Sequence, residues 1–165
     1  MTVKELVTGA LLAAMALVIP LFFRGWLQIV IPPFSATLAS HVPVMLAMFI
    51  SPVVAAMVGL ASTLGFLVTL GAVVAARASI HIGWAFLGAI LYRRGLHPLA
   101  VLLLAIPLHA GGEGLVVIPL GFALPAAWLV AWGTAVHHLL DMSITLLIYP
   151  LLLSYFPRPG RVRGG

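Results

Sequence analysis

Apolar residues fill most of this chain in long runs, which prolines, glycines and charged residues interrupt at intervals. A helix that crosses a bilayer needs about 20 mostly apolar residues. The runs therefore predict an all-α integral membrane protein with about six transmembrane helices, in a single membrane domain that covers residues 1–165. We expect the spans at about residues 5–23, 39–50, 53–74, 79–92, 98–118 and 125–156.

The second predicted span is shorter than the others. Its apolar run has only about a dozen residues before the pair Ser51-Pro52, too few to cross hydrocarbon directly. Proline disfavours helix at the residue before it, so we expect a tight turn there. The second span is thus either short or extended by the proline-rich connection 24–37. The first run is expected to remain a helix, because the residues around Arg24 are too bulky for a signal-peptide cleavage site.

Composition strengthens the membrane interpretation. Of the 165 residues, 64% are hydrophobic and 7% are charged, with a mean hydropathy of +1.26. A water-soluble domain carries about 25% charged residues, so that class is excluded. The Lys and Arg residues are scattered and form no stripe for nucleic acid. The chain has no cysteine, which excludes disulfides and thiolate metal sites.

The positions of the basic residues predict the orientation. Cytoplasmic loops of membrane proteins hold an excess of Lys and Arg. If the amino end is cytoplasmic and the chain crosses six times, only Arg24 and Arg77 lie outside. Both termini are therefore predicted to be cytoplasmic, together with the remaining basic residues, Lys4, Arg93, Arg94, Arg158, Arg161 and Arg163.

Polar residues at membrane depth are rare and usually face the protein interior, so they mark candidate sites. Under this topology nearly all of them fall in the outer half, around one cavity open to the outside, and Asp141 lies deeper. The candidate ligand-binding residues are His41, Arg77, His81, Trp84, His109, Glu113, Trp132, His137 and His138.

Helical spacing groups some of these candidates. His109 and Glu113 are four residues apart and share a helix face. Only one of His137 and His138 can face Asp141 squarely. The glycines among residues 111–114 suggest a break in the helix. Non-helical backbone is tolerated at membrane depth where it lines a cavity. Arginine as a clamp and tryptophan as a stacking face suit a small heterocyclic ligand that bears a carboxylate.

Simpler interpretations stand beside these. Arg24 and Arg77 are equally suited to anchoring at lipid headgroups. One of the adjacent histidines, His137 or His138, could simply form a hydrogen bond to a neighbouring helix. The His109–Glu113 pair could likewise hold helices together without contacting a ligand.

Small residues lie four apart in the first span, at Ala10 and Ala14, a spacing that permits close helix contact. With this motif and the stretches 39–52 and 59–66, the chain resembles the substrate-binding S components of energy-coupling factor vitamin transporters, in the niacin or pantothenate groups. The resemblance implies a prokaryotic plasma-membrane protein that binds one vitamin. It also implies docking through Ala10 and Ala14 to a membrane scaffold subunit driven by two ATPases, with no cofactor in this chain.

The leading hypothesis is therefore vitamin capture without catalysis, with nicotinate favoured and pantothenate second. The chain has no Gly-x-x-x-x-Gly-Lys-[Ser/Thr] loop, so active transport requires a partner. One alternative is an intramembrane metal-dependent enzyme, because imidazoles and carboxylates in one cavity are able to hold zinc; its residues are His109, Glu113, His137, His138 and Asp141. No His-Glu-x-x-His or Gly-x-Ser-x-Gly motif supports that alternative. A second alternative is a purely structural membrane subunit.

Overall fold

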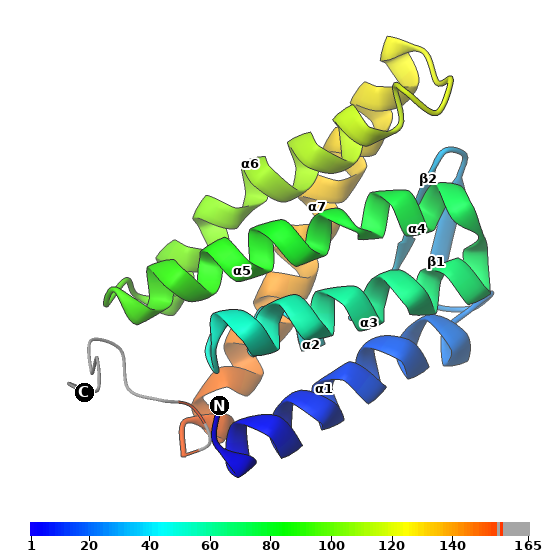
Figure 1. The fold of residues 1–165 in the computed structure, drawn as a ribbon. Coiled ribbons are helices and arrows are strands. Elements are labelled where there is room, and N and C mark those ends of the chain that lie inside the picture. The colour runs from blue at the N-terminus through cyan, green and yellow to red at the C-terminus, as the bar shows by residue number, and fades with distance from the viewer. Residues whose placement is uncertain (155, 157–165) are drawn as a thin grey trace.

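The structure, a computed structural model, describes residues 1–154 and 156, and it is a bundle of helices with one small β-hairpin (Figure 1). The elements in chain order are α1 (Val3–Phe22), β1 (Gln28–Ile31), β2 (Phe34–Thr37), α2 (Val42–Met48), α3 (Pro52–Leu70), α4 (Ala72–Ala78), α5 (Ile80–Arg93), α6 (Pro98–Val116), α7 (Leu124–Ile148) and a 3-10 turn, η1 (Tyr149–Leu152).

Within the described residues, five helical segments are long and apolar enough to cross a membrane: α1, α3, α4 with α5, α6, and α7 with η1. Their outward faces are covered with exposed Leu, Val, Ile and Met side chains, which suits a lipid environment. The predicted fold class, an all-α integral membrane protein, is confirmed. The second predicted pass contains only the short helix α2.

Helix α2 is short because it lies inside the bundle rather than against lipid. Each of its residues is buried, and a helix that is hydrophobic all round is typical of a protein interior. The pass is completed by non-helical residues 38–41. Such backbone is tolerated at membrane depth only where protein surrounds it and satisfies its polar groups. Here the Asp141 carboxylate accepts hydrogen bonds from the backbone N–H groups of Ala39, at 2.8 Å, and His41, at 2.9 Å.

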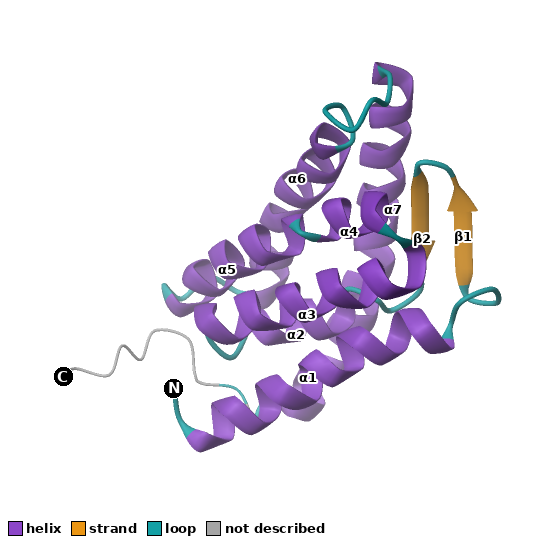
Figure 2. Cartoon of the chain, turned by 45° about the vertical axis from the view of Figure 1, so that its right-hand side comes forward, coloured by secondary structure: helices purple, strands orange, loops and turns teal. Residues whose placement is uncertain are grey.

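The connection that follows α1 contains a β-hairpin that the sequence analysis did not predict. Strands β1 and β2 pair antiparallel, with Gln28 opposite Thr37 and Ile31 opposite Phe34. Pro32 and Pro33 occupy the turn between them, where neither is required to donate a backbone hydrogen bond. Strand β2 packs against α7, so the hairpin lies along one side of the bundle (Figure 2).

Helix boundaries differ from the prediction most clearly in the fourth span. A single residue, Gly71 with φ of 86°, separates α3 from α4, and only glycine adopts that conformation without strain. The fourth span therefore begins at Ala72 rather than near 79. As a result Arg77 lies within a helix, whereas the sequence analysis placed it just before one.

The break predicted in the fifth span is absent: α6 continues through Gly111, Gly112 and Gly114 to Val116. Gly112 and Gly114 serve close packing instead. A Cβ atom on Gly114 would lie 2.9 Å from the carbonyl oxygen of Ala127 on α7, and one on Gly112 would lie 2.6 Å from Ile80 Cγ2. Side chains of ordinary size would therefore separate α6 from its neighbours.

Both ends of the described chain lie at the same end of the bundle, and the turn of the hairpin lies toward the other (Figures 1 and 2). Lys4 Nζ donates to the Ser154 carbonyl oxygen at 2.6 Å. Arg93 is the last residue of α5 at this end and Arg94 follows it, whereas Arg24 lies at the hairpin end. Which end is cytoplasmic stays a prediction, and the predicted inner arginines Arg158, Arg161 and Arg163 lie outside the described residues.

Candidate functional site

A group of polar side chains is buried between the helices on the hairpin side of the bundle. We call it the polar cluster. Its members come from the turn before α2 and from α4, α5, α6 and α7, and none is more than 6% exposed. They are His41, Arg77, His81, His109, Glu113, His137, His138 and Asp141.

Glu113 is the centre of one half of the cluster. Its Oε2 accepts hydrogen bonds from Arg77 Nη2 at 2.6 Å, from Arg77 Nε at 2.9 Å and from Thr134 Oγ1 at 2.9 Å. Its Oε1 lies 3.1 Å from His109 Nε2 and 3.3 Å from His81 Nε2. The carboxylate therefore joins α4, α5, α6 and α7. The expected pairing of His109 with Glu113 on one helix face is present.

Arg77 connects this carboxylate to the hairpin. Its Nη1 donates to the Pro33 carbonyl oxygen at 2.9 Å, and its Nη2 donates to the Ser35 carbonyl oxygen at 3.3 Å. The guanidinium also lies 5.5 Å from the centre of the Phe34 ring. Arg77 is only 3% exposed, so it is not the headgroup anchor that the sequence left open. Its donors already have partners, one of them a charged carboxylate.

Asp141 organises the other half of the cluster. Besides the backbone bonds that hold residues 39–41, its Oδ2 lies 3.2 Å from His137 Nε2 and 3.2 Å from His41 Nδ1. The His41 contact is close but is not aligned as a hydrogen bond. His137 Nε2 also faces the Thr37 carbonyl oxygen at 3.0 Å, which ties α7 to β2. His137 is thus the histidine of the adjacent pair that faces Asp141.

His138, the other member of that pair, points toward α6. Its Nε2 lies 3.0 Å from the Leu102 carbonyl oxygen, and its Nδ1 lies 2.9 Å from His109 Nδ1. The Trp84 indole stacks on the His109 ring, with centroids 4.7 Å apart. Trp84 Nε1 is buried and has no hydrogen-bond partner among the described residues. The indole thus presents a flat face and an unused donor beside the imidazoles.

The His41 ring lies among the other imidazoles. Its centroid is 4.4 Å from that of His137, 4.5 Å from that of His109 and 4.8 Å from that of His81, with the last two rings nearly perpendicular to it. A small cavity adjoins these rings and is bounded by the hairpin and by Phe66, Arg77 and His137. The volume of this cavity that a water molecule can occupy is about 20 Å³. That is room for one or two waters and too little for an aromatic ring.

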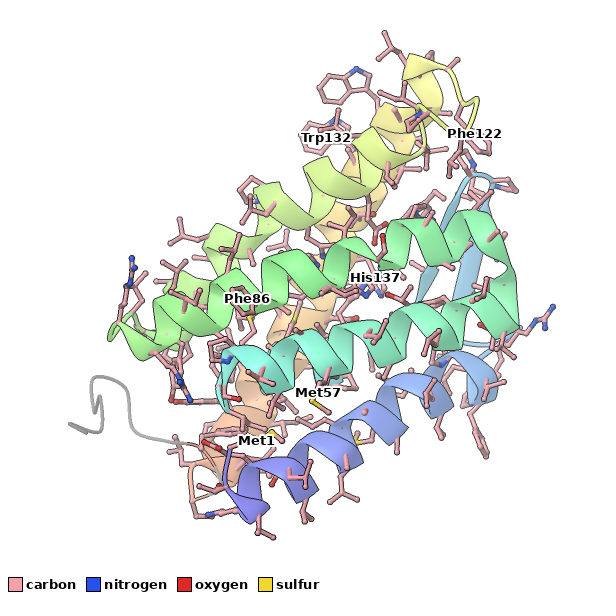
Figure 3. The ribbon with its side chains drawn as sticks, viewed as in Figure 1. Met1, Met57, Phe86, Phe122, Trp132 and His137 are labelled. Carbon is pink, nitrogen blue, oxygen red and sulfur yellow. The ribbon has the colours of Figure 1, made fainter. Side chains whose placement is uncertain are left out.

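The structure brings together the sequence-predicted site residues His41, Arg77, His81, Trp84, His109, Glu113, His137 and His138. It does not bring Trp132 to them. Trp132 is 68% exposed on the outer face of α7, where it lines an apolar groove beside the hairpin. Figure 3 shows its side chain pointing away from the bundle and that of His137 pointing inward.

Several contributors were missed because they are small or come from an unpredicted element. Thr134 and Ser62 bond Glu113 and His81, and the hairpin supplies the carbonyl groups of Pro33, Ser35 and Thr37. Spacing held a signal for Thr134, because positions 134, 138 and 141 follow one helix face. The carbonyl groups of the hairpin have no signature in side-chain type.

The predicted docking residues Ala10 and Ala14 lie away from the cluster, on the exposed face of α1. The opposite face of α1 packs on α3: a Cβ atom on Gly9 would lie 2.9 Å from Val54 Cγ1. The small face is therefore open at the outer surface of the bundle.

Comparison with known proteins supplies one informative relative. No protein-family model and no solved structure matches the chain. A curated protein of Lactococcus lactis subsp. cremoris, the niacin transporter NiaX, is 35% identical over 174 aligned positions, which cover 94% of this chain and 77% of the relative. With identity of this level along nearly the whole length, and with apolar helices that suit a multi-pass protein of the cell membrane, the chain is a transporter protein rather than an enzyme and belongs to the niacin-type S components.

Proposed function

We propose that this protein is the high-affinity substrate-binding subunit for uptake of nicotinate, and that the polar cluster, with Trp84, is its binding site. The observation that carries the proposal is the gathering of imidazoles, an arginine and an indole at one buried position in a bundle that is otherwise apolar. Buried ionisable groups in membrane proteins mark sites of function because they are costly to place there. The relative is a niacin transporter by name, which supports niacin as the vitamin.

A flat heterocycle suits the rings of this cluster. Trp84 and His109 already stack, and His41 meets His81 and His109 edge to face, so a pyridine ring is able to replace one of these contacts with little change in geometry. The unused Trp84 Nε1 and the imidazole nitrogens are donors and acceptors for a ring nitrogen or a carboxylate. Pantothenate stays the second candidate, since it has a carboxylate but no aromatic ring to stack.

A ligand carboxylate would have to compete for Arg77 with the groups that already bond its guanidinium. The guanidinium shares its Nη1 and Nη2 between Glu113 and the carbonyl oxygens of Pro33 and Ser35. A carboxylate forms stronger bonds with arginine than a neutral carbonyl does. We therefore expect the ligand to replace the hairpin carbonyls at Arg77, while the Glu113 pair remains. The hairpin would then be loosened from Arg77 during entry.

We further propose that uptake requires an energy-coupling partner, a membrane scaffold subunit with two ATPases. This chain has no nucleotide-binding loop, so it cannot supply the energy itself. The exposed small residues Ala10 and Ala14 on α1 are the proposed contact, because small side chains let helix backbones approach closely in lipid. Replacing both with Leu should abolish uptake by cells and leave nicotinate binding by the purified chain unchanged. Loss of binding, or full retention of uptake, would contradict this docking face.

Binding of labelled nicotinate to the purified protein tests the proposed ligand, with pantothenate and nicotinamide as unlabelled competitors. We expect a submicromolar Kd and displacement by nicotinate first. His81→Gln should weaken binding at least tenfold. The matched control is His97→Asn, which removes an exposed imidazole at the start of α6 and keeps the capping bond to Leu99 N. Absence of submicromolar nicotinate binding would overturn the ligand, and equal affinity in His81→Gln would overturn the site.

A further inference from the structure

The hydrogen-bond pattern of the polar cluster leaves one short contact without a proton. The Leu102 carbonyl oxygen can only accept, so His138 Nε2 facing it at 3.0 Å must carry the hydrogen. A neutral His138 then accepts at Nδ1, and His109 Nδ1, 2.9 Å away, must donate. This assignment leaves His109 Nε2 as a bare lone pair.

That lone pair faces another acceptor. His109 Nε2 lies 3.1 Å from Glu113 Oε1, an oxygen of a carboxylate that pairs with Arg77. Two acceptors at this distance repel unless a cation lies between them. The charge balance leads to the same conclusion. When the imidazoles are neutral, Arg77 offsets the charge of only one of the two buried carboxylates, Glu113 and Asp141. The cluster therefore requires at least one further positive charge, which either a proton or a metal ion supplies.

We propose that a divalent transition-metal ion binds here, held by Glu113 and by ring nitrogens of His81, His109 and His41. One ligand atom from each of these residues lies within 4.8 Å of the others. Zinc bonds to nitrogen and oxygen are about 2.0–2.2 Å, so ligand atoms of a tetrahedral site are separated by roughly 3.3 Å. Glu113 Oε1 is 3.1 Å from His109 Nε2 and 3.3 Å from His81 Nε2. Any longer separation among the four ligand atoms, none above 4.8 Å, would have to shorten on binding.

The groups around these ligands also fit a metal better than a shared proton. A metal-bound histidine usually donates its second ring nitrogen to a fixed partner, which sets its orientation. His81 Nδ1 lies 3.0 Å from Ser62 Oγ, and His109 Nδ1 is bonded to His138. His41 Nδ1 lies 3.2 Å from an Asp141 oxygen, and a small turn of the ring would align this contact as a hydrogen bond. Imidazole with one carboxylate, and no thiolate, is a donor set for zinc or nickel. The sequence analysis predicted no cofactor and no metal site in this chain, and the proposed ion departs from that prediction.

A metal ion would also change the site that binds the vitamin, a consequence that rests on the proposed function. Arg77 is already paired with Glu113, so it offers a ligand carboxylate only a shared charge. A divalent ion makes the cluster net positive and provides an attachment for the carboxylate or the ring nitrogen of nicotinate. Metal binding itself does not depend on the identity of the vitamin.

Titration with Zn²⁺ alone tests the site. The protein is purified without a polyhistidine tag, freed of metal by a chelator, and titrated with Zn²⁺ against a coloured competing chelator; Co²⁺ reports the geometry through its absorption. We expect one Zn²⁺ per chain, a tetrahedral Co²⁺ spectrum and a Tm that rises on adding Zn²⁺. The absence of saturable binding at one ion per chain would overturn the proposal and leave a proton as the cation.

Variants locate the ion. His109→Gln and His81→Gln should weaken Zn²⁺ binding more than tenfold, and His97→Asn should leave it unchanged. Ser62→Ala keeps all the ligands and removes only the partner of His81, so it should weaken binding about 10–100-fold even if the histidine variants fail to fold. Unchanged Zn²⁺ affinity in Ser62→Ala and in whichever histidine variants fold would overturn this placement.

The two proposals fail separately. Nicotinate binding without any Zn²⁺ binding overturns the metal site and leaves the proposed function standing. Zn²⁺ binding without nicotinate binding does the reverse. When both bind, a chelator should weaken nicotinate binding at least tenfold, and equal nicotinate affinity with and without the chelator overturns the link between them.

Discussion

The two ends of the bundle interior are built differently. Around α2 and the end of α5, the interior is filled by large apolar side chains such as Met45, Phe49 and Tyr92, each no more than 2% exposed. Phe49 meets the rings of Tyr92 and Tyr149 with centroids 5.0 and 4.8 Å apart. On the hairpin side, equally buried positions hold imidazoles, carboxylates and a guanidinium. The same helices supply both regions.

The difference affects how each region tolerates substitution. Apolar side chains pack without fixed partners, so many combinations of similar volume would fill the first region. In the polar cluster each group needs a specific partner, and removal of one leaves another buried and unsatisfied. A membrane protein that only needed to fold could fill both regions with leucine. The polar cluster is therefore where we place the proposed binding site.

The largest effect is expected from Glu113→Gln. The change leaves the Arg77 guanidinium buried beside a neutral amide, and breaking a buried ion pair costs about 3–5 kcal/mol. We expect a marked drop in the Tm of the detergent-solubilised protein and loss of nicotinate binding. A second variant, Arg77→Gln with Glu113→Gln, should recover part of the stability. A double variant as unstable as the sum of the single changes would contradict the pairing.

Asp141→Asn should have the next largest effect. The amide keeps one acceptor where the carboxylate serves the N–H groups of Ala39 and His41 and the ring of His137. An unsatisfied buried donor costs about 1–3 kcal/mol. Hydrogen exchange should show faster exchange at residues 38–41 than in the wild type. Unchanged protection of these amides would contradict the role of Asp141 in holding the turn before α2.

Phe49→Leu tests the other region. Shortening this buried ring should destabilise the protein by about 1–2 kcal/mol through lost contacts. The nicotinate Kd should stay within twofold of the wild type, because Phe49 packs among Tyr92, Tyr149 and Phe156 and not with the polar cluster. A tenfold change in Kd at this position would show that the two regions are coupled.

Gly133→Ala should affect kinetics more than stability. A Cβ atom there would lie 2.5 Å from Phe34 Cε2, so the hairpin must shift away from α7. The strain is offset in part by the higher helix propensity of alanine, about 1 kcal/mol. We expect nicotinate to dissociate several-fold faster with little change in Tm. Stopped-flow measurement of the dissociation rate checks this, and an unchanged rate would mean that the hairpin does not cover the site.

The helical class and most members of the polar cluster could be predicted from the sequence, because membrane burial makes polar residues conspicuous. His109 and Glu113 were paired from their spacing alone, and the structure shows the contact at 3.1 Å. The hairpin was not predicted, since its strands are short and its ties to Arg77 are made by backbone carbonyl groups. Trp132 was grouped with the site by its depth, which does not determine the face of a helix.

The central claim is that nicotinate binds in the polar cluster beside Trp84, and single-tryptophan variants test it most directly. One variant keeps only Trp84 and has Phe at positions 26, 128 and 132; its counterpart keeps only Trp132. A pyridine ring stacked near an indole quenches its fluorescence. If nicotinate binds beside Trp84, we expect saturable quenching by nicotinate in the Trp84 variant and none in the Trp132 variant. Quenching of Trp132 alone, or no quenching of Trp84 while nicotinate still binds, would contradict it.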